Sequence, residues 1–360
     1  MIIAGGGIIG LSLSIELRKR GASVLIVERG EPGHEASRAA GGMLVDCPLE
    51  THPALQALAM ASARLYPEFA YELEVESGIK VDLRDHGTIF FSESASDEDE
   101  RESEYSKFFA ANMLPAPLAE LEPALATTNL AVCYLKERSV DPRALTAAAL
   151  KTAKNRGVDF SSGDTVTAVN LSDGHVSGVT TKKTSFLAEK VVNCVGAWAG
   201  QIGPQSFPTR PVKGQMLCLA MHPRELIRHV IRSPQVYLIP RSDGRLLAGA
   251  TVEEAGFDKR TDVATMQRFH QAAIALVPAL RNARILEDWA GLRPGTPDKL
   301  PILGATRTPG YYVATGHFRD GILLSAITAQ VMADVITGGE PAHDLSAFSA
   351  DRFSEASAPV

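Results

Sequence analysis

Three glycines and one acidic residue near the start of the chain have the spacing that binds a dinucleotide. Gly5, Gly7 and Gly10 follow an apolar run that begins at Met1. Between a strand and a helix, a GxGxxG pattern allows a tight turn and close approach of backbone N–H groups to phosphates. The diphosphate then lies at the positive end of the helix dipole. Glu28 comes eighteen residues after Gly10, where a carboxylate accepts hydrogen bonds from ribose hydroxyls and repels a 2′-phosphate.

The elements around this pattern support the dinucleotide interpretation. Residues 11–20 predict a helix that ends in three basic residues and stops at Gly21. Residues 23–27 predict a second strand, which places Glu28 at its tip. The alternative is a glycine-rich turn in an ordinary α/β core.

Composition defines the class of protein and excludes several partners. The chain has 360 residues, a length typical of two domains, and its net charge of −6 gives no basic surface for nucleic acid. Its four cysteines are scattered without metal-like spacing, so we expect no metal site. Residues 2–15 lack the charged start of a signal peptide, and no apolar run is long enough for a membrane span. We therefore expect a cytoplasmic protein, and a homo-oligomer stays open.

The rest of the chain alternates strands and helices. Residues 29–43 predict a loop whose small residues suit close approach of the backbone to a ligand. A hairpin at 165–181 turns at Asp173-Gly174, and a buried parallel strand follows at 191–195. A β-meander inserted between Rossmann units is typical of flavoproteins rather than of NAD dehydrogenases. Further helices are predicted over 53–78, 142–157, 266–280 and 322–336. The second of these starts with Asp141 as N-cap and Pro142 at the first helical position.

This order of elements predicts an α/β fold with two domains. One is a Rossmann-like FAD-binding domain with a β-meander, and the other is a substrate-binding domain with an antiparallel sheet. The acidic run 93–104 is interpreted as solvated surface. The predicted limits are 1–86, 133–209 and 287–360 for the discontinuous FAD-binding domain, and 87–132 and 210–286 for the substrate domain.

The C-terminal part of the chain carries a second ligand-binding pattern. The motif 316–321 follows a predicted strand at 311–314 and precedes the helix at 322–336. The start of that helix offers free N–H groups and a positive dipole end. Because a reduced flavin is negatively charged around N1 and the C2 carbonyl, we expect the flavin end of FAD here. The other end of FAD then lies on residues 5–10.

Arg293 and Tyr237 each allow more than one interpretation from the sequence alone. Arg293 stands between Gly291 and Gly295 in an expected turn at a strand end, and a guanidinium binds a carboxylate bidentately. The alternative is a surface or salt-bridged arginine. Tyr237 lies in a predicted strand, where a plain core residue is the alternative.

Several separate segments together resemble the glycine oxidase (ThiO-type) branch of the D-amino-acid oxidase flavoproteins, over nearly the whole chain. The resemblance implies FAD-dependent oxidation of glycine, sarcosine and D-alanine by O2 to the 2-oxo acid, ammonia and hydrogen peroxide. It also implies a link to thiamine (thiazole) biosynthesis. The segments that carry it are 5–10, 37–44, 211–214, Tyr237 with Pro240-Arg241, 249–251, 289–296 and 316–324.

The resemblance implies roles for individual residues as well. Arg293 and Tyr237 hold the substrate carboxylate, and Arg319 lies beside the substrate. Gln235 and Val252 stand where glycine oxidases carry His and Met, and both border the pocket, so substrate size stays open. Besides Gly5, Gly7 and Gly10, non-covalent FAD is expected to contact Ile8, Ile9, Glu28, Arg29, Ala36, Ser37, Gly41, Gly42, Met43, Val166, His317, Phe318, Arg319, Asp320, Gly321, Ile322 and Leu323.

Two other functions stay open. A D-amino-acid dehydrogenase passes its electrons to a quinone or a protein, and a non-catalytic flavin-binding subunit leaves the chemistry to a partner. A second GxGxxG is absent from the sequence, which argues against NADPH as the reductant. No compelling general base stands out, and hydride transfer from Cα needs none.

Overall fold

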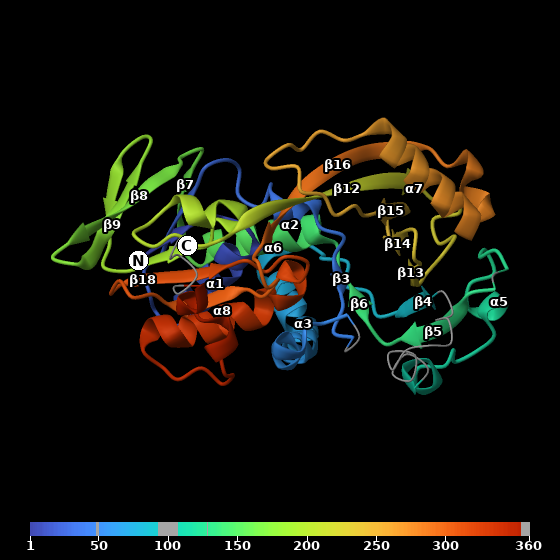
Figure 1. The fold of residues 1–360 in the computed structure, drawn as a ribbon, viewed down its shortest axis with the longest axis horizontal. Coiled ribbons are helices and arrows are strands. Elements are labelled where there is room, and N and C mark those ends of the chain that lie inside the picture. The colour runs from blue at the N-terminus through green and yellow to red at the C-terminus, as the bar shows by residue number, and fades with distance from the viewer. Residues whose placement is uncertain (48–49, 93–106, 128, 354–360) are drawn as a thin grey trace, which may run out of the picture.

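The computed structural model describes residues 1–47, 50–92, 107–127 and 129–353 (Figure 1). The acidic run 93–104 lies outside the described residues. Within the described residues, the strands form sheets of six, three, seven and two strands. No helix in this part of the chain is long and apolar enough to cross a membrane.

The six-stranded sheet confirms the Rossmann-like prediction. Its central strands are parallel, and only the pair formed by the last two strands of the chain is antiparallel. Helix α1 (Ile8–Lys19) connects the first strand to the second. In spatial order the strands are β17 (Ile302–Ala305), β18 (Tyr311–Thr315), β11 (Val191–Asn193), β1 (Ile2–Ala4), β2 (Leu25–Glu28) and β7 (Asp159–Ser162).

Helices cover one face of this sheet and the meander covers the other. Ile3 and Ile26 pack into a core shared with the helices, whereas their neighbours Ile2 and Val27 pack against Val179 of the meander. Alternate residues of a strand face opposite sides of the sheet. Because both sides of this sheet are covered, its central strands carry apolar residues on both faces. The helices are α1, α3 (Gln56–Ser77), α6 (Pro142–Asn155) and α8 (Gly321–Thr337).

The meander confirms the hairpin that the sequence predicts. It consists of β8 (Val166–Ser172), β9 (His175–Thr181) and β10 (Ser185–Leu187), paired antiparallel. Asp173 and Gly174 both have positive φ, at 50° and 79°, as the tight turn of a two-residue hairpin requires. Figure 1 shows the meander at one end of the molecule.

The seven-stranded sheet lies toward the other end and is covered on one face by helix α7 (Val263–Leu276) (Figure 1). Its two longest strands, β12 and β16, pair antiparallel over most of their length. Its order is β16 (Ile285–Gly295), β12 (Arg210–Ala220), β15 (Arg245–Gly249), β14 (Tyr237–Pro240), β13 (Val230–Arg232), β4 (Thr88–Ser92) and β5 (Ala131–Leu135). Because β5 and β16 run across residues 132 and 286, the sheet does not end at those predicted domain limits. The division into two domains stays a prediction.

Three local predictions need correction. The expected loop at 29–43 contains a short helix, α2 (Ala36–Ala39), and ends in β3 (Met43–Leu44), which pairs with β6 (Arg138–Ser139). The helix predicted over 266–280 ends at Leu276, because Pro278 lacks the N–H that would continue it. Arg293 lies within β16, paired with Val212, rather than in a turn.

The remaining elements are short, apart from the capped start of α6. Asp141 accepts hydrogen bonds from the N–H groups of Arg143 and Ala144, so the predicted cap of α6 is confirmed. The short elements are α5 (Leu118–Leu121) and five 3-10 helices, η1 (Pro53–Leu55), η2 (Gly196–Gln201), η3 (Pro278–Asn282), η4 (Ser346–Phe348) and η5 (Ala350–Phe353).

Candidate functional site

The glycine loop has the backbone geometry that a diphosphate needs. Gly5 has φ of +101°, and a Cβ on it would lie 2.5 Å from the Cys194 carbonyl oxygen. A Cβ on Gly10 would lie 2.1 Å from the carbonyl oxygen of Gly5. The N–H groups in the first turn of a helix have no partners within the helix. Helix α1 begins after Gly7, which has no side chain to accept hydrogen bonds from them. The loop therefore fits a phosphate group at the helix N terminus.

Glu28 and Ser37 are both brought to this loop. The Glu28 carboxylate accepts hydrogen bonds from the N–H groups of Gly6, at 2.8 Å, and Gly30, at 2.9 Å. Ser37, on α2, accepts one from the N–H of Ile8, at 2.9 Å. These bonds hold the acid and the hydroxyl beside the start of α1. Both residues therefore lie beside the glycine loop, and their contact with FAD stays a prediction.

Arg29 takes part in a three-layer stack that joins distant segments. Its guanidinium carbon lies 3.4 Å from the centroid of the Trp198 ring, and Phe257 stacks on Trp198 at 5.0 Å between ring centroids. Glu35 forms ion pairs with both Arg29 and Lys259. No sequence pattern predicts this stack, because residues from three separate segments form it.

The motif 316–321 leads into α8 as predicted. His317 is buried, and its Nε2 lies 3.1 Å from Thr328 Oγ1; burial lowers the pKa of His317 to about 3. Burial raises the pKa of the Asp320 carboxyl to about 6. Asp320 precedes α8 without a side-chain capping bond. The helix start is therefore open to an anionic group, and His317 is a neutral hydrogen-bonding residue at physiological pH.

The side chains of Ile322, Leu323 and Val166 are buried, so the predicted contacts of these residues with FAD involve only backbone atoms. The side chains of Ile322 and Leu323 are buried among the helices, and that of Val166 is buried beneath the parallel sheet. The carbonyl oxygens of Ile322 and Leu323 accept hydrogen bonds from Tyr66 and Ser62 of α3. Helix α3 therefore fixes the start of α8.

The three candidate substrate residues come together. Burial raises the pKa of the Tyr237 phenol, and the nearby guanidinium groups of Arg293 and Arg319 act in the opposite direction. The Arg293 Nη1 donates to the carbonyl oxygens of Thr251, at 3.0 Å, and Lys213, at 3.2 Å. The backbone N–H of Phe318 donates to the carbonyl of Pro294 and so ties the α8 motif to β16.

Glycine at position 214 makes room for Arg293. A Cβ on Gly214 would lie 2.3 Å from both Nη atoms of Arg293. On the same face of the sheet, the Tyr237 hydroxyl donates to Met216 Sδ, and a Cβ on Gly41 would lie 3.6 Å from the Tyr237 ring. The flavin-contacting segment predicted at 41–43 therefore lies against the substrate residues. Met43 packs in the same apolar cluster as Tyr237.

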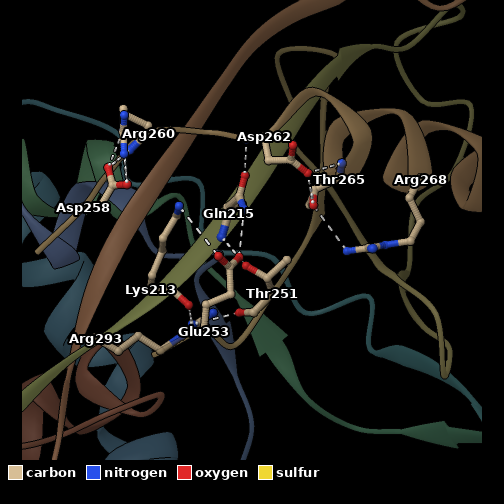
Figure 2. Close-up of polar contacts among 10 residues, drawn as sticks. All are labelled: Lys213, Gln215, Thr251, Glu253, Asp258, Arg260, Asp262, Thr265, Arg268 and Arg293. Atoms are coloured by element: carbon tan, nitrogen blue, oxygen red, sulfur yellow. Dashed lines mark hydrogen bonds and ion pairs between the residues drawn. The ribbon is translucent and has the colours of Figure 1, made fainter. Parts of the chain in front are cut away.

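A cavity of about 500 Å³ lies on the α7 side of β12. Leu217 packs against α7, whereas Met216 packs with Tyr237, so successive residues of β12 face opposite sides. Figure 2 shows Lys213, Gln215 and Thr251 between Arg293 and the α7 residues Thr265 and Arg268. The wall also includes Gln235 and Val252. The residues whose carbonyls hold Arg293 thus separate it from this cavity.

Among the described residues, no group of three or more His, Cys, Asp or Glu side chains is arranged to hold a metal ion. The parallel sheet with its glycine loop, the meander and the antiparallel sheet beside them together define a nucleotide-dependent oxidoreductase. A family model described as FAD dependent oxidoreductase matches residues 1–335. The chain belongs to this family, and its cofactor is FAD.

Individual relatives are similar over almost the whole chain. It is 35% identical to the glycine oxidase of Geobacillus kaustophilus, with 97% of this chain and 96% of that protein covered. The crystal structure of glycine oxidase from that organism has a TM-score of 0.90 at 32% identity and covers 98% of each chain. The hydrogen cyanide synthase subunit HcnC of Pseudomonas aeruginosa is 30% identical over 100% of this chain and 97% of its own length.

Other relatives are longer than this chain. The bifunctional protein ThiO/ThiG of Trichormus variabilis is 34% identical over 98% of this chain, which covers 55% of that protein. The chain spans about half the length of the bifunctional relatives it matches.

Proposed function

We propose that this protein oxidises glycine and other small amino acids, among them sarcosine and D-alanine, with O2 and water. The products are the 2-oxo acid, hydrogen peroxide and ammonia, with methylamine in place of ammonia when the substrate is sarcosine. The observation that carries the proposal is the convergence of Tyr237, Arg293 and Arg319 beside the segment 41–43. The similarity to glycine oxidases supports the same reaction. We also place the reaction in thiamine (thiazole) biosynthesis, and the similarity to ThiO/ThiG proteins supports this.

The residues toward the cofactor have separate tasks in this proposal. The N–H groups at residues 5–10 hold the diphosphate, Glu28 holds the ribose, and the segment 41–43 and the start of α8 hold the flavin. Bound FAD supplies the redox chemistry, which is hydride acceptance from the substrate Cα and reoxidation by O2.

Arg293 and Tyr237 bind the substrate carboxylate and thereby set which face of Cα meets the cofactor. Two carbonyl oxygens hold Arg293 Nη1, so the guanidinium is oriented before substrate arrives. The substrate amine reacts in its neutral form. His317 does not remove its proton, because this imidazole is buried against Thr328.

We expect substrate size to be set on the face of the antiparallel sheet that carries Tyr237 and Arg293. The resemblance places Gln235 and Val252 at the substrate pocket, but both line the cavity on the α7 side, which Lys213 and Thr251 separate from Arg293. We expect turnover of glycine, sarcosine and D-alanine with modest discrimination, because one methyl group in an apolar pocket changes binding by about 1–3 kcal/mol. Comparing kcat/KM for the three with L-alanine tests this. A preference for L-alanine would overturn the proposed binding mode, and a strict requirement for glycine would overturn the proposed room for a methyl group beside Tyr237 and Arg293.

Non-covalent cofactor binding is a separate prediction. The four cysteines are free and buried, and the segments 289–296 and 316–321 contain none. The purified protein should be yellow, release its flavin on acid precipitation, and keep its colour when NADPH is added. Flavin that stays with the precipitated protein would contradict this prediction.

One experiment separates the proposed oxidase from the other functions. The yellow protein is mixed anaerobically with glycine or D-alanine, its visible absorbance is followed, and air is then admitted. Loss of colour followed by rapid recovery with hydrogen peroxide supports the oxidase. Slow recovery indicates a dehydrogenase that needs a quinone or protein acceptor. No loss of colour indicates a flavin-binding subunit, an alternative that the similarity to HcnC keeps open.

A further inference from the structure

Arg241 is a charged side chain that is almost wholly enclosed. It follows β14, is 1% exposed and is the largest of the fully buried side chains. Burial lowers the pKa of its guanidinium to about 10, so it is still charged at neutral pH. Burying a charge costs free energy, and a protein with an apolar side chain of similar size at the same position is often at least as stable. Stability alone therefore gives no reason for an arginine here.

The nearby carboxylates are bonded to other groups. Asp141 Oδ1 accepts from the start of α6, and its Oδ2 accepts from Arg245. Asp82 accepts from the backbone N–H and the hydroxyl of Ser242. These acids attract Arg241 through space, yet its Nε and Nη1 have no hydrogen-bond partner among the described residues.

The remaining donor of Arg241 points to its role. Its Nη2 donates to the carbonyl oxygen of Gly41, at 2.5 Å. The carbonyl of Gly42 accepts from the N–H of Val140, at 2.8 Å. Gly42 has φ of +76°, and a Cβ on it would lie 2.1 Å from the Val140 carbonyl oxygen. The carbonyl oxygens of Gly41 and Gly42 are thus each held by a hydrogen bond. Gly42 also adopts a backbone conformation that favours glycine.

We propose that Arg241 is a positioning residue for the cofactor. It fixes the segment 41–43 against Tyr237 so that this segment can contact the flavin, and its buried positive charge favours negative charge on the bound cofactor. An oriented charge in a water-poor site acts strongly on a group whose charge changes during the reaction. The inference rests on the proposed function, because it takes residues 41–43 as flavin contacts.

The test compares two variants of Arg241. Arg241→Met keeps most of the side-chain length and removes the charge, whereas Arg241→Lys keeps the charge and removes the planar set of guanidinium N–H donors. The measurements are the Kd for FAD on reconstitution of the apoprotein, the flavin midpoint potential and the visible spectrum. We expect Arg241→Met to raise the Kd at least tenfold and to make the potential more negative. Arg241→Lys should restore the potential but only part of the affinity. Arg281→Met, which changes an exposed arginine of η3, should change neither quantity.

The outcomes are decisive whether or not the uncharged variant folds. An Arg241→Met protein with wild-type Kd and potential overturns the proposal. If this variant does not fold, Arg241→Lys decides: wild-type Kd for FAD overturns the proposal, and weakened FAD binding at an unchanged potential supports it. The Kd for FAD and the midpoint potential are both measured in the absence of an amino-acid substrate. Failure of glycine to reduce the wild-type flavin would therefore count against the proposed function and not against the role of Arg241.

Discussion

Replacing Arg293 with alanine is expected to raise the KM for glycine by roughly 10- to 150-fold. The reason is the loss of a charge-assisted bidentate contact, worth about 1.5–3 kcal/mol, with each 1.4 kcal/mol equal to a tenfold change. Arg293→Lys should recover only part of this, since an ammonium cannot form the planar pair of hydrogen bonds. Initial rates of hydrogen peroxide formation over a range of glycine concentrations measure the effect.

The control for this prediction is Arg307→Ala, which removes an exposed arginine that pairs with Asp351. It should leave KM unchanged, and both variants should retain FAD. If Arg293→Ala and Arg293→Lys both keep the wild-type KM, another residue holds the carboxylate and the proposed site is wrong.

Gly214→Ala is expected to produce nearly the same defect from a residue that touches no substrate. The added Cβ would lie 2.3 Å from the Arg293 guanidinium. Because the guanidinium is the far end of a flexible side chain, it moves and the fold survives. It then leaves the carbonyl oxygens of Lys213 and Thr251. We expect KM to rise at least tenfold while FAD content and melting temperature stay near those of the wild type.

A double-mutant cycle makes this prediction specific. If Gly214→Ala acts only by displacing Arg293, the variant that combines it with Arg293→Ala should be no worse than Arg293→Ala alone. Gly339→Ala is the matched control, since its Cβ would meet its neighbours only at ordinary contact distance. Additive effects would show that Gly214 acts through something other than Arg293.

Much of the fold could be predicted because its signals are local. The GxGxxG pattern, the Asp141-Pro142 helix start and the Asp173-Gly174 turn each depend on the conformational preferences of a few adjacent residues. Element ends were less predictable. The break before Pro278 and the short helix α2 depend on packing and on single hydrogen bonds that periodicity does not record.

The sheet partners of individual residues could not be read from local pattern. Glycines on both sides of Arg293 are typical of a turn, yet β16 continues to Gly295. The partner strand explains this: Gly291 lies opposite Gly214, where the Arg293 side chain crosses. A pairing between residues about eighty positions apart leaves no mark in the sequence near either one.

The site residues could be named from resemblance, but their supports could not. Met216 beneath Tyr237, the stack on Trp198 and the clamp by Arg241 all join segments far apart in the chain. The resemblance includes Arg241 in the pair Pro240-Arg241 but implies no role for it. Its burial, which makes it chemically interesting, is a property of the folded molecule alone.

Strand β16 sets the distance between helix α2, which Trp289 contacts, and Arg293. The indole of Trp289 donates to the Ala39 carbonyl at 3.0 Å, and Arg293 lies four residues further on the same face, roughly 13 Å away at the rise of a β-strand. The separation between Arg293, the proposed carboxylate anchor, and the contact with α2 is thus set by the covalent geometry of one strand. Changes in the residues that line the cavity on the α7 side of this sheet therefore leave the distance between Arg293 and α2 unaltered.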